Sequence, residues 1–349
     1  MRPPGAEPFS EDDLIARAKT GDSSAFDRLA ARHRRELGAH CYRMLGSPHD
    51  ADDALQESLI AAWKGLPSFA GRSSLKTWLY QVTTHVCLRM IAKRPRRAMS
   101  PEVAPPLADA SELGQPVMEP IWLEPLLDDD ALSDAAAADE PVAAFQRREN
   151  VALAFVAALQ HLPGTQRAVL LLREVLEYSA AETAETLNTS VASVNSALQR
   201  AQKTVKERMP AISQQAEQRA LGDAGLRRLL GAFVTAWEAR NVGDLVALLT
   251  EDARFTMPPL LAWFDGRAAV ERFIADRVFA TSWRLVPLSA NGQPGFACYL
   301  RMDGRSEYRL GAINLLSLRG GRICAVNSFL DPALHGRLGL PAALAPASS

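Results

Sequence analysis

A run of aromatic, hydroxyl and basic side chains between residues 76 and 97 is the part of this chain best suited to bind a charged polymer. Aromatic and hydroxyl groups can contact bases, and the cations that follow can neutralise phosphates. From residue 14 to 98 the chain has 15 Lys and Arg against 7 Asp and Glu, a net charge of +8. We therefore predict a nucleic-acid contact by Lys76, Tyr80, Thr84, Arg89, Lys93, Arg94, Arg96 and Arg97.

A second set of such residues lies between 191 and 206. Val194, Leu198, Ala201 and Val205 recur at helical spacing, which places them on one buried face. The opposite face carries residue types that contact base edges and phosphates, namely Ser193, Asn195, Ser196, Gln199, Arg200 and Lys203. The pattern fits the recognition helix of a helix-turn-helix, with its turn at residues 188–190, although an ordinary three-helix bundle fits as well.

An acidic helix predicted from residue 50 onward precedes the first basic run. We expect Asp50 to cap it, and its apolar residues form one buried stripe. A second face carries Asp53, Gln56, Glu57 and Ile60, which is a polar surface with one exposed apolar residue. This face is either simply solvated or a docking surface for another protein.

The C-terminal region contains the acid and base groups that could support catalysis. Asp252, Asp265 and Tyr299 are the candidates, but Asp252 and Asp265 fall where turns and caps are expected, and His335 has no evident partner. Trp237, Met257, Trp263, Tyr299 and Asn327 could line a ligand pocket, and core packing explains most of them equally well. We expect no catalytic residue and a regulatory or interaction domain.

Cysteine spacing and hydropathy exclude several other classes of protein. The four cysteines lie far apart and match no metal or redox motif, so we expect no metal, no cofactor and reduced thiols. The N-terminus has no apolar signal region, and no apolar run approaches the roughly 20 residues that a membrane helix needs. These features predict a cytoplasmic protein without membrane contact.

Composition and periodicity divide the chain into four parts. Helical patterns fill residues 10–98 and 145–210, whereas residues 99–142 hold 11 Asp and Glu with no Lys or Arg, many prolines and an alanine run. That composition predicts an acidic flexible linker. Residues 222–342 begin with amphipathic helices and continue with strand-like runs separated by turn residues, which predicts an α+β domain. The predicted fold is therefore multidomain, with two all-α modules and a C-terminal α+β domain.

Three stretches resemble one known family. FDRLAARHRREL, DADDALQESLIAAW and LKTWLYQVT are similar to region 2 of sigma-70-family sigma factors, and LPGTQRAVLLLREV with AETAETLNTSVASVNSALQRAQ is similar to region 4. The final domain, with LTEDARFTMPP and a last strand that enters FLDP, resembles the conical SnoaL-like fold. Together they resemble the SigG-like subset of the extracytoplasmic-function (ECF) type.

The resemblance implies a function and a set of partners. Asp53, Gln56, Glu57 and Ile60 would dock core RNA polymerase, the segment from Phe69 to Arg97 would capture the −10 element of promoter DNA, and residues 191–206 would recognise the −35 element. The C-terminal domain would modulate activity through a small-molecule ligand or an intramolecular contact. In the family the linker threads through polymerase, although an acidic solvated spacer fits residues 99–142 equally well.

Two other functions remain open at this point. One is a ligand-responsive helix-turn-helix transcription regulator, which would not need the arrangement of Asp53 to Trp63 followed by Trp78. The other is a SnoaL-type isomerase fused to a DNA-binding module, which would need an ordered acid/base pair inside the cone.

Overall fold

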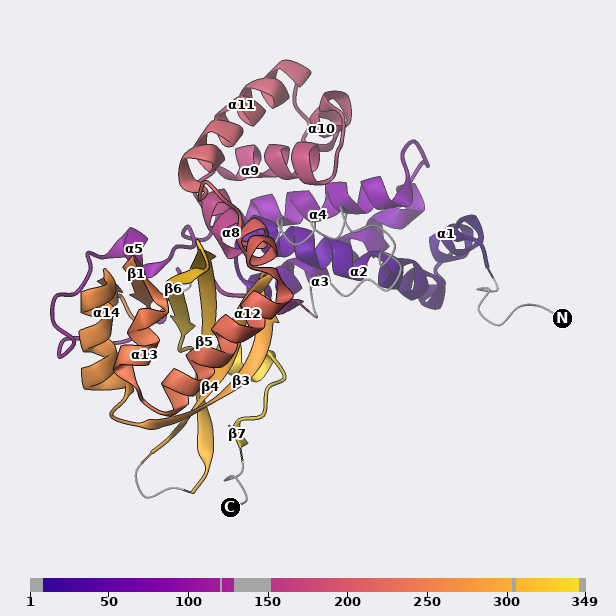
Figure 1. Cartoon of the computed structure of the whole chain (residues 1–349). Coiled ribbons are helices and arrows are strands. Elements are labelled where there is room, and N and C mark those ends of the chain that lie inside the picture. Colours follow the sequence, from indigo (N-terminus) through magenta and orange to yellow (C-terminus); the bar gives the residue numbers. More distant parts are fainter. Residues whose placement is uncertain (1–8, 120, 129–151, 303–305, 345–349) are drawn as a thin grey trace. The chain divides into compact units, whose positions relative to one another are not determined.

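The computed structural model describes most of the chain, namely residues 9–119, 121–128, 152–302 and 306–344. Contacts divide the protein into two compact units, which comprise residues 1–95 with 159–207 and residues 96–158 with 208–349. The first holds most of the helices and the second holds the sheet (Figure 1). Among the described residues no helix is both long and apolar enough to cross a membrane.

The N-terminal module of the first unit is a bundle of α1 (Glu11–Lys19), α2 (Ser23–Leu45), α3 (Pro48–Gly65) and α4 (Leu75–Ile91), with a short η1 (Leu66–Ser68) after α3. Each α-helix begins where a polar side chain accepts a backbone N–H of the first turn: Ser10, Asp22, Ser47 and Ser74. The prediction that Asp50 caps α3 is wrong, because Pro48 starts the helix two residues earlier and Ser47 is the cap.

The second helical module consists of α8 (Leu153–Gln160), α9 (Gly164–Leu170), the π-helical η3 (Leu171–Val175), α10 (Ala180–Thr186) and α11 (Val191–Arg208). A capping box of Ser179 and Glu182 starts α10. Asn188 adopts a left-handed conformation, with φ of 51°, in the turn between α10 and α11. Val169, Ala184, Val194 and Ala197 form the small core that holds this pair together.

Helices and a sheet form the second unit. The helices are α12 (Gln214–Glu238), α13 (Val242–Ala247), α14 (Arg267–Phe273), the π-helical η4 (Ile274–Val278) and α15 (Pro332–Arg337). Helix α12 is broken at Gly222, whose φ of 69° and ψ of 162° are not helical. Phe233 and Trp237 of α12 reach the core, and the Phe233 ring stacks on Phe296 with centroids 5.4 Å apart.

The described strands form one seven-stranded sheet: β1 (Leu249–Thr256), β2 (Trp263–Asp265), β3 (Ser282–Ala290), β4 (Gln293–Arg301), β5 (Tyr308–Arg319), β6 (Arg322–Phe329) and β7 (Ala343–Leu344). Their order is β2-β1-β6-β5-β4-β3, and β7 pairs with β5. Only the β1–β6 pair is parallel in this sheet. Helices α12 to α14 and the sheet enclose a largely apolar core, as the predicted α+β class requires. We call the described residues from 214 to 344 the conical domain.

The described residues between 97 and 128, which we call the strap, pack on the conical domain and include the short helix α5 (Ser100–Val103). Backbone bonds join Leu107 N to Trp263 O at 2.8 Å and Val117 N to Pro259 O at 2.9 Å. The strap therefore differs from the unpacked tether that its composition predicts, because backbone hydrogen bonds fix it and the side chains of Leu107, Ala110 and Leu113 pack at the apolar core. The rest of the predicted linker, residues 129–142, lies outside the described residues.

Candidate protein-docking and nucleic-acid surfaces

One face of α3 carries all four residues of the predicted docking surface. Asp53, Gln56, Glu57 and Ile60 are exposed, and Ile60 keeps 49% of its surface accessible. They project away from the buried stripe of the helix, which consists of Ala51, Ala54, Leu55, Ser58, Leu59 and Ala62. An exposed isoleucine among carboxylates is a surface that a protein partner can cover, with the apolar side chain buried and the acids paired with cations.

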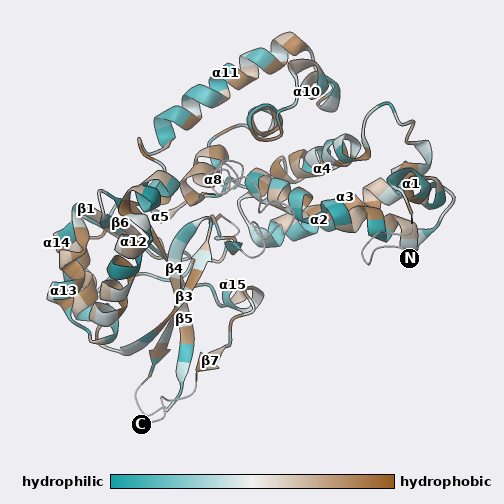
Figure 2. Cartoon of the chain, turned by 45° about the vertical axis from the view of Figure 1, so that its right-hand side comes forward, coloured by the Kyte–Doolittle hydropathy of each residue, from teal (hydrophilic) through white to brown (hydrophobic). Residues whose placement is uncertain are grey.

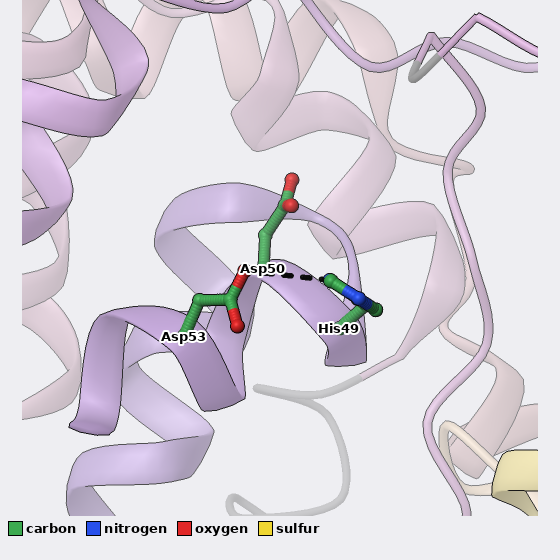
Figure 3. Close-up of side chains that lie close together, drawn as sticks. All are labelled: His49, Asp50 and Asp53. Atoms are coloured by element: carbon green, nitrogen blue, oxygen red, sulfur yellow. Dashed lines mark ion pairs between the residues drawn. The ribbon is translucent and has the colours of Figure 1, made fainter. Parts of the chain in front are cut away.

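The first two turns of α3 bring three potential ligand groups together (Figure 3). His49 Nδ1 lies 3.5 Å from a carboxylate oxygen of Asp53, one helical turn away, and both side chains are exposed. Asp50 is buried and pairs with Arg94, which follows α4. Because Arg94 already neutralises Asp50, we assign no metal to this group.

Five of the predicted basic DNA contacts, at the start and end of α4 and just after it, lie at the surface. Lys76 pairs with Glu36 at 2.6 Å and Arg89 pairs with Glu57 at 2.8 Å, and all four side chains are substantially exposed. Lys93 and Arg94 are exposed too, and Arg96 pairs with Glu102 of the strap at 2.9 Å. Exposed ion pairs of this kind contribute little stability, so a phosphate can replace the carboxylate partner at low cost.

Three of the predicted DNA contacts are buried instead. Tyr80 and Thr84 are 2% and 0% exposed, and both approach His40 of α2: the Tyr80 ring lies 5.3 Å from the His40 ring and Thr84 Oγ1 lies 2.9 Å from His40 Nε2. Arg97 is 6% exposed and donates to Trp122 O and Glu124 within the strap. The apolar periodicity of α4 marks one buried stripe, whereas helix α4 packs on more than one side.

The second helical module supplies the additional cover on α4. The Tyr178 ring contacts the Tyr80 ring edge-on at 6.4 Å, and Gly164 of α9 approaches Leu88 and Ile91 so closely that a Cβ atom there would lie 3.2 to 3.3 Å from them. Arg167 of α9 is buried and donates to the backbone carbonyl of Met44 and, at 2.7 Å, to Gln160. Sequence reasoning missed Arg167, since a single arginine in an apolar helix gives no sign of its partner.

Helix α11 presents the predicted recognition residues to solvent. Ser193, Asn195, Ser196, Gln199, Arg200 and Lys203 are all exposed, whereas Val194, Ala197 and Ala201 are buried. The helix is hydrophilic along most of its length in Figure 2. Neutral polar groups lie in its first half and the cations Arg200, Lys203 and Lys206 lie in its second half, which suits base-edge contacts at one end and phosphate contacts at the other.

The five predicted pocket residues do not share one environment. Trp237 and Met257 belong to the apolar core, whereas the Trp263 indole donates to Ala104 O of the strap at 2.8 Å. Asn327 accepts from Thr256 at 3.0 Å, and Tyr299 is fully buried. Burial raises the pKa of the Tyr299 hydroxyl, so this group stays protonated at neutral pH.

The candidate acid and base groups of the conical domain lie at its surface or are occupied. Asp252 pairs with Arg319, which lowers the pKa of this exposed carboxyl, and Asp265 pairs with Arg254 at 3.0 Å. His335 is buried with Nε2 3.2 Å from Phe329 O, and burial lowers its pKa. These groups do not form an acid/base pair directed into the core.

Comparison with known proteins gives three family matches in chain order. Residues 29–97 match sigma-70 region 2, residues 152–205 match sigma-70 region 4, and residues 230–326 match the SnoaL-like domain. These matches agree with the two helical modules and the conical domain.

Similar proteins cover nearly the whole chain. The chain is 40% identical to the ECF RNA polymerase sigma factor SigG of Mycobacterium tuberculosis, across 97% of this chain and 88% of that one. It is 26% identical to the sigma factor SigW of Bacillus subtilis, across 56% of this chain and 94% of that one. The crystal structure of the sigma factor SigJ of Mycobacterium tuberculosis has the same fold, with a TM-score of 0.56, 21% identity and coverage of 88% of this chain and 97% of that one. The chain therefore belongs to the ECF sigma factors of RNA polymerase, and to those among them that carry a SnoaL-like C-terminal domain.

Proposed function

We propose that this sigma factor, which directs core RNA polymerase to promoters, docks on the polymerase through α3, holds the −10 element with the basic end of α4, and recognises the −35 element with α11. The observation that carries this division is the exposed face of Asp53, Gln56, Glu57 and Ile60 on α3, opposite its buried stripe. A conventional repressor has no need of such a face next to a basic helix.

The −10 contact requires the two helical modules to separate. Tyr80 is buried as folded, and the Tyr178 ring of the second module lies against it.

For the conical domain we propose a modulating role without catalysis. Its carboxylates Asp252 and Asp265 are exposed and paired with arginines, whereas an isomerase needs an acid/base pair next to an enclosed substrate. The strap supplies an intramolecular partner for this domain. Because its partner is RNA polymerase, we propose that the protein acts in the cytoplasm.

Reconstitution with core RNA polymerase and run-off transcription from genomic fragments tests the proposal. We expect the full-length protein to co-purify with core polymerase and to produce transcripts from a restricted set of promoters. Absence of both would refute the proposed docking face and its DNA-binding roles together. Separate binding assays with core polymerase and with promoter DNA show which of the two surfaces has been misassigned.

A further inference from the structure

Region 2 is joined to the conical domain by a very short segment. Helix α4 ends at Ile91, and Arg97 is already fixed in the strap by its bonds to Trp122 O at 2.9 Å and Glu124 at 3.0 Å. Backbone bonds continue this attachment from Ala98 to Ile121 and Leu123, and Ser100 Oγ donates to Leu260 O at 3.1 Å. Only residues 92–96 lie between the helix and this attachment, and five residues span at most about 18 Å.

Region 4 is joined to the same domain by an equally short segment. Helix α11 ends at Arg208, and Gln214 of α12 binds Leu318 on β5 through both of its amide atoms, with Gln214 Nε2 to Leu318 O at 3.0 Å and Leu318 N to Gln214 Oε1 at 2.7 Å. Gln215 donates to Gly292 O at 2.6 Å, and Glu217 accepts from Gly320 N at 2.9 Å. Residues 209–213 are therefore the whole connection, again with a reach of at most about 18 Å.

One hairpin turn binds both the end of the strap and the start of α12. Asn291 and Gly292, between β3 and β4, have φ values of 56° and 67°, as a tight two-residue hairpin turn requires. From the strap, Leu126 exchanges two bonds with Asn291, at 2.9 and 3.0 Å, and Asp128 accepts from Gly292 N at 2.7 Å. From α12, Gln215 and Gln218 donate to Gly292 O, so the turn fixes the end of the strap and the start of α12 together.

The N-terminal part of α12 has its own attachment to the conical domain. Gly222 separates residues 214–221 from the part of the helix that carries Phe233 and Trp237 into the core. The side-chain bonds of Gln214 and Gln215 and the partly buried Leu221 hold this first part on the domain. If it detached, the connection to region 4 would grow from five to about 14 residues, with a reach of about 50 Å.

We infer that the conical domain is a spacer gauge, which limits how far apart regions 2 and 4 can bind and thereby selects promoters by the length between the −10 and −35 elements. The inference rests on the proposed roles of α4 and α11. Each added base pair moves one element by about 3.4 Å and turns it by about 35° around the DNA axis. Two short connections to one folded domain can accommodate only a few such changes in spacer length, whereas a flexible linker would accommodate many.

The test is run-off transcription by reconstituted holoenzyme from promoters that differ only in spacer length, in single base-pair steps. The wild-type protein should show a sharp optimum. Gln214→Ala combined with Gln215→Ala should broaden this optimum, because the longer connection restores simultaneous binding of both elements. At spacers two base pairs from the optimum, the ratio of transcript to that at the optimum should rise at least about fivefold over the wild-type ratio. Thr235→Ala, a neutral change at an exposed position of the same helix, is the matched control and should retain the sharp optimum.

A second variant leaves every bond of the conical domain in place. Insertion of about six Gly and Ser residues after Ile212 lengthens the connection alone and should broaden the optimum in the same way. A profile that stays unchanged in the insertion variant overturns the gauge, even if the glutamine variant proves unstable in thermal unfolding. If the wild-type protein gives no promoter-dependent transcript at any spacing, the proposed DNA-binding roles fail instead, and the two failures are thereby distinguished.

Discussion

Thr84 Oγ1 of α4 lies 2.9 Å from Nε2 of His40 of α2, and both side chains are completely buried. The other ring nitrogen of His40, Nδ1, has no hydrogen-bond partner among the described residues. Burial, with a smaller contribution from the positive charge of Arg43, lowers the pKa of His40 to about 3. The imidazole is therefore neutral in the folded protein at any pH near neutrality, and region 2 has a buried polar contact that acid can break.

This contact predicts a pH dependence of stability. The unfolded chain binds a proton at His40 below about pH 6.5 and the folded chain does not, so the free energy of unfolding should fall as pH drops from 6.5 towards 3, by up to about 1.4 kcal/mol per pH unit. Denaturant unfolding of region 2 at a series of pH values measures this slope. His40→Gln should reduce the slope, although His33, whose pKa burial also lowers, still contributes. The exposed His49→Gln is the control, and equal slopes in all three proteins would contradict the assignment.

The docking face on α3 predicts a loss of polymerase binding on charge reversal. Asp53→Arg places a cation where the proposed partner surface is basic, and should weaken binding to core polymerase by at least about tenfold because like charges across an interface are strongly unfavourable. Titration of labelled protein with core polymerase provides the measurement. Asp27→Arg reverses an exposed carboxylate on α2 and is the matched control. Wild-type affinity in the Asp53 variant would remove this face from the proposed interface.

The Tyr80–Tyr178 contact predicts that the two helical modules can be uncoupled. Tyr178→Ala removes the edge-on ring pair, worth about 0.5 to 1.5 kcal/mol beyond its buried area, and should shift the first unit towards separated modules. Hydrogen exchange of the α4 amides should then become faster, and promoter binding by the free protein should increase. Tyr308→Ala, in the conical domain, should leave α4 exchange at its wild-type rate. Unaltered exchange after the Tyr178 change would show that other contacts hold the modules together.

Helix α11 predicts two separable effects on DNA binding. Lys203→Ala removes a cation that contacts phosphate and no base edge, so it should weaken binding to all promoters alike. The slope of log K against log salt concentration should become shallower by the amount that corresponds to about one phosphate contact. Asn195→Ala should instead relax discrimination at one base pair of the −35 element and leave the salt slope as it is. Affinity measurements across a salt series on matched and mismatched promoters separate the two. A shared phenotype would show that α11 lies differently on the DNA.

Periodicity in the sequence identifies the elements that have one buried face. The stripe of α3 and the polar face of α11 both follow from helical spacing, and the structure has the predicted residues exposed on each. Tyr80 and Thr84 could not be placed in this way, because His40 on the same bundle and Tyr178 on a distant segment determine their burial. In a helix that packs on several sides, the apolar stripe in the sequence marks only one of those sides.

The strap shows a different limit of sequence analysis. Proline and acidic residues predict an unpacked chain because they form no apolar periodicity. The strap is nevertheless held by Leu107 N, Val117 N and the backbone around Ala98, and composition contains no information about main-chain partners. Gln214 and Gln215 are similar, since glutamines at the start of a helix give no indication that one binds strand β5 and the other the turn between β3 and β4.

The burial of the strap changes what a truncated form of this protein would be. Ala110 belongs to the core of the conical domain, and the partly buried Leu107 and Leu113 pack against that core. A chain that stops after region 4 would therefore keep these side chains and lose the surface that covers them. Such a fragment would expose apolar side chains between its two DNA-binding modules. Its aggregation or altered activity could then result from that exposed segment as much as from the loss of the domain.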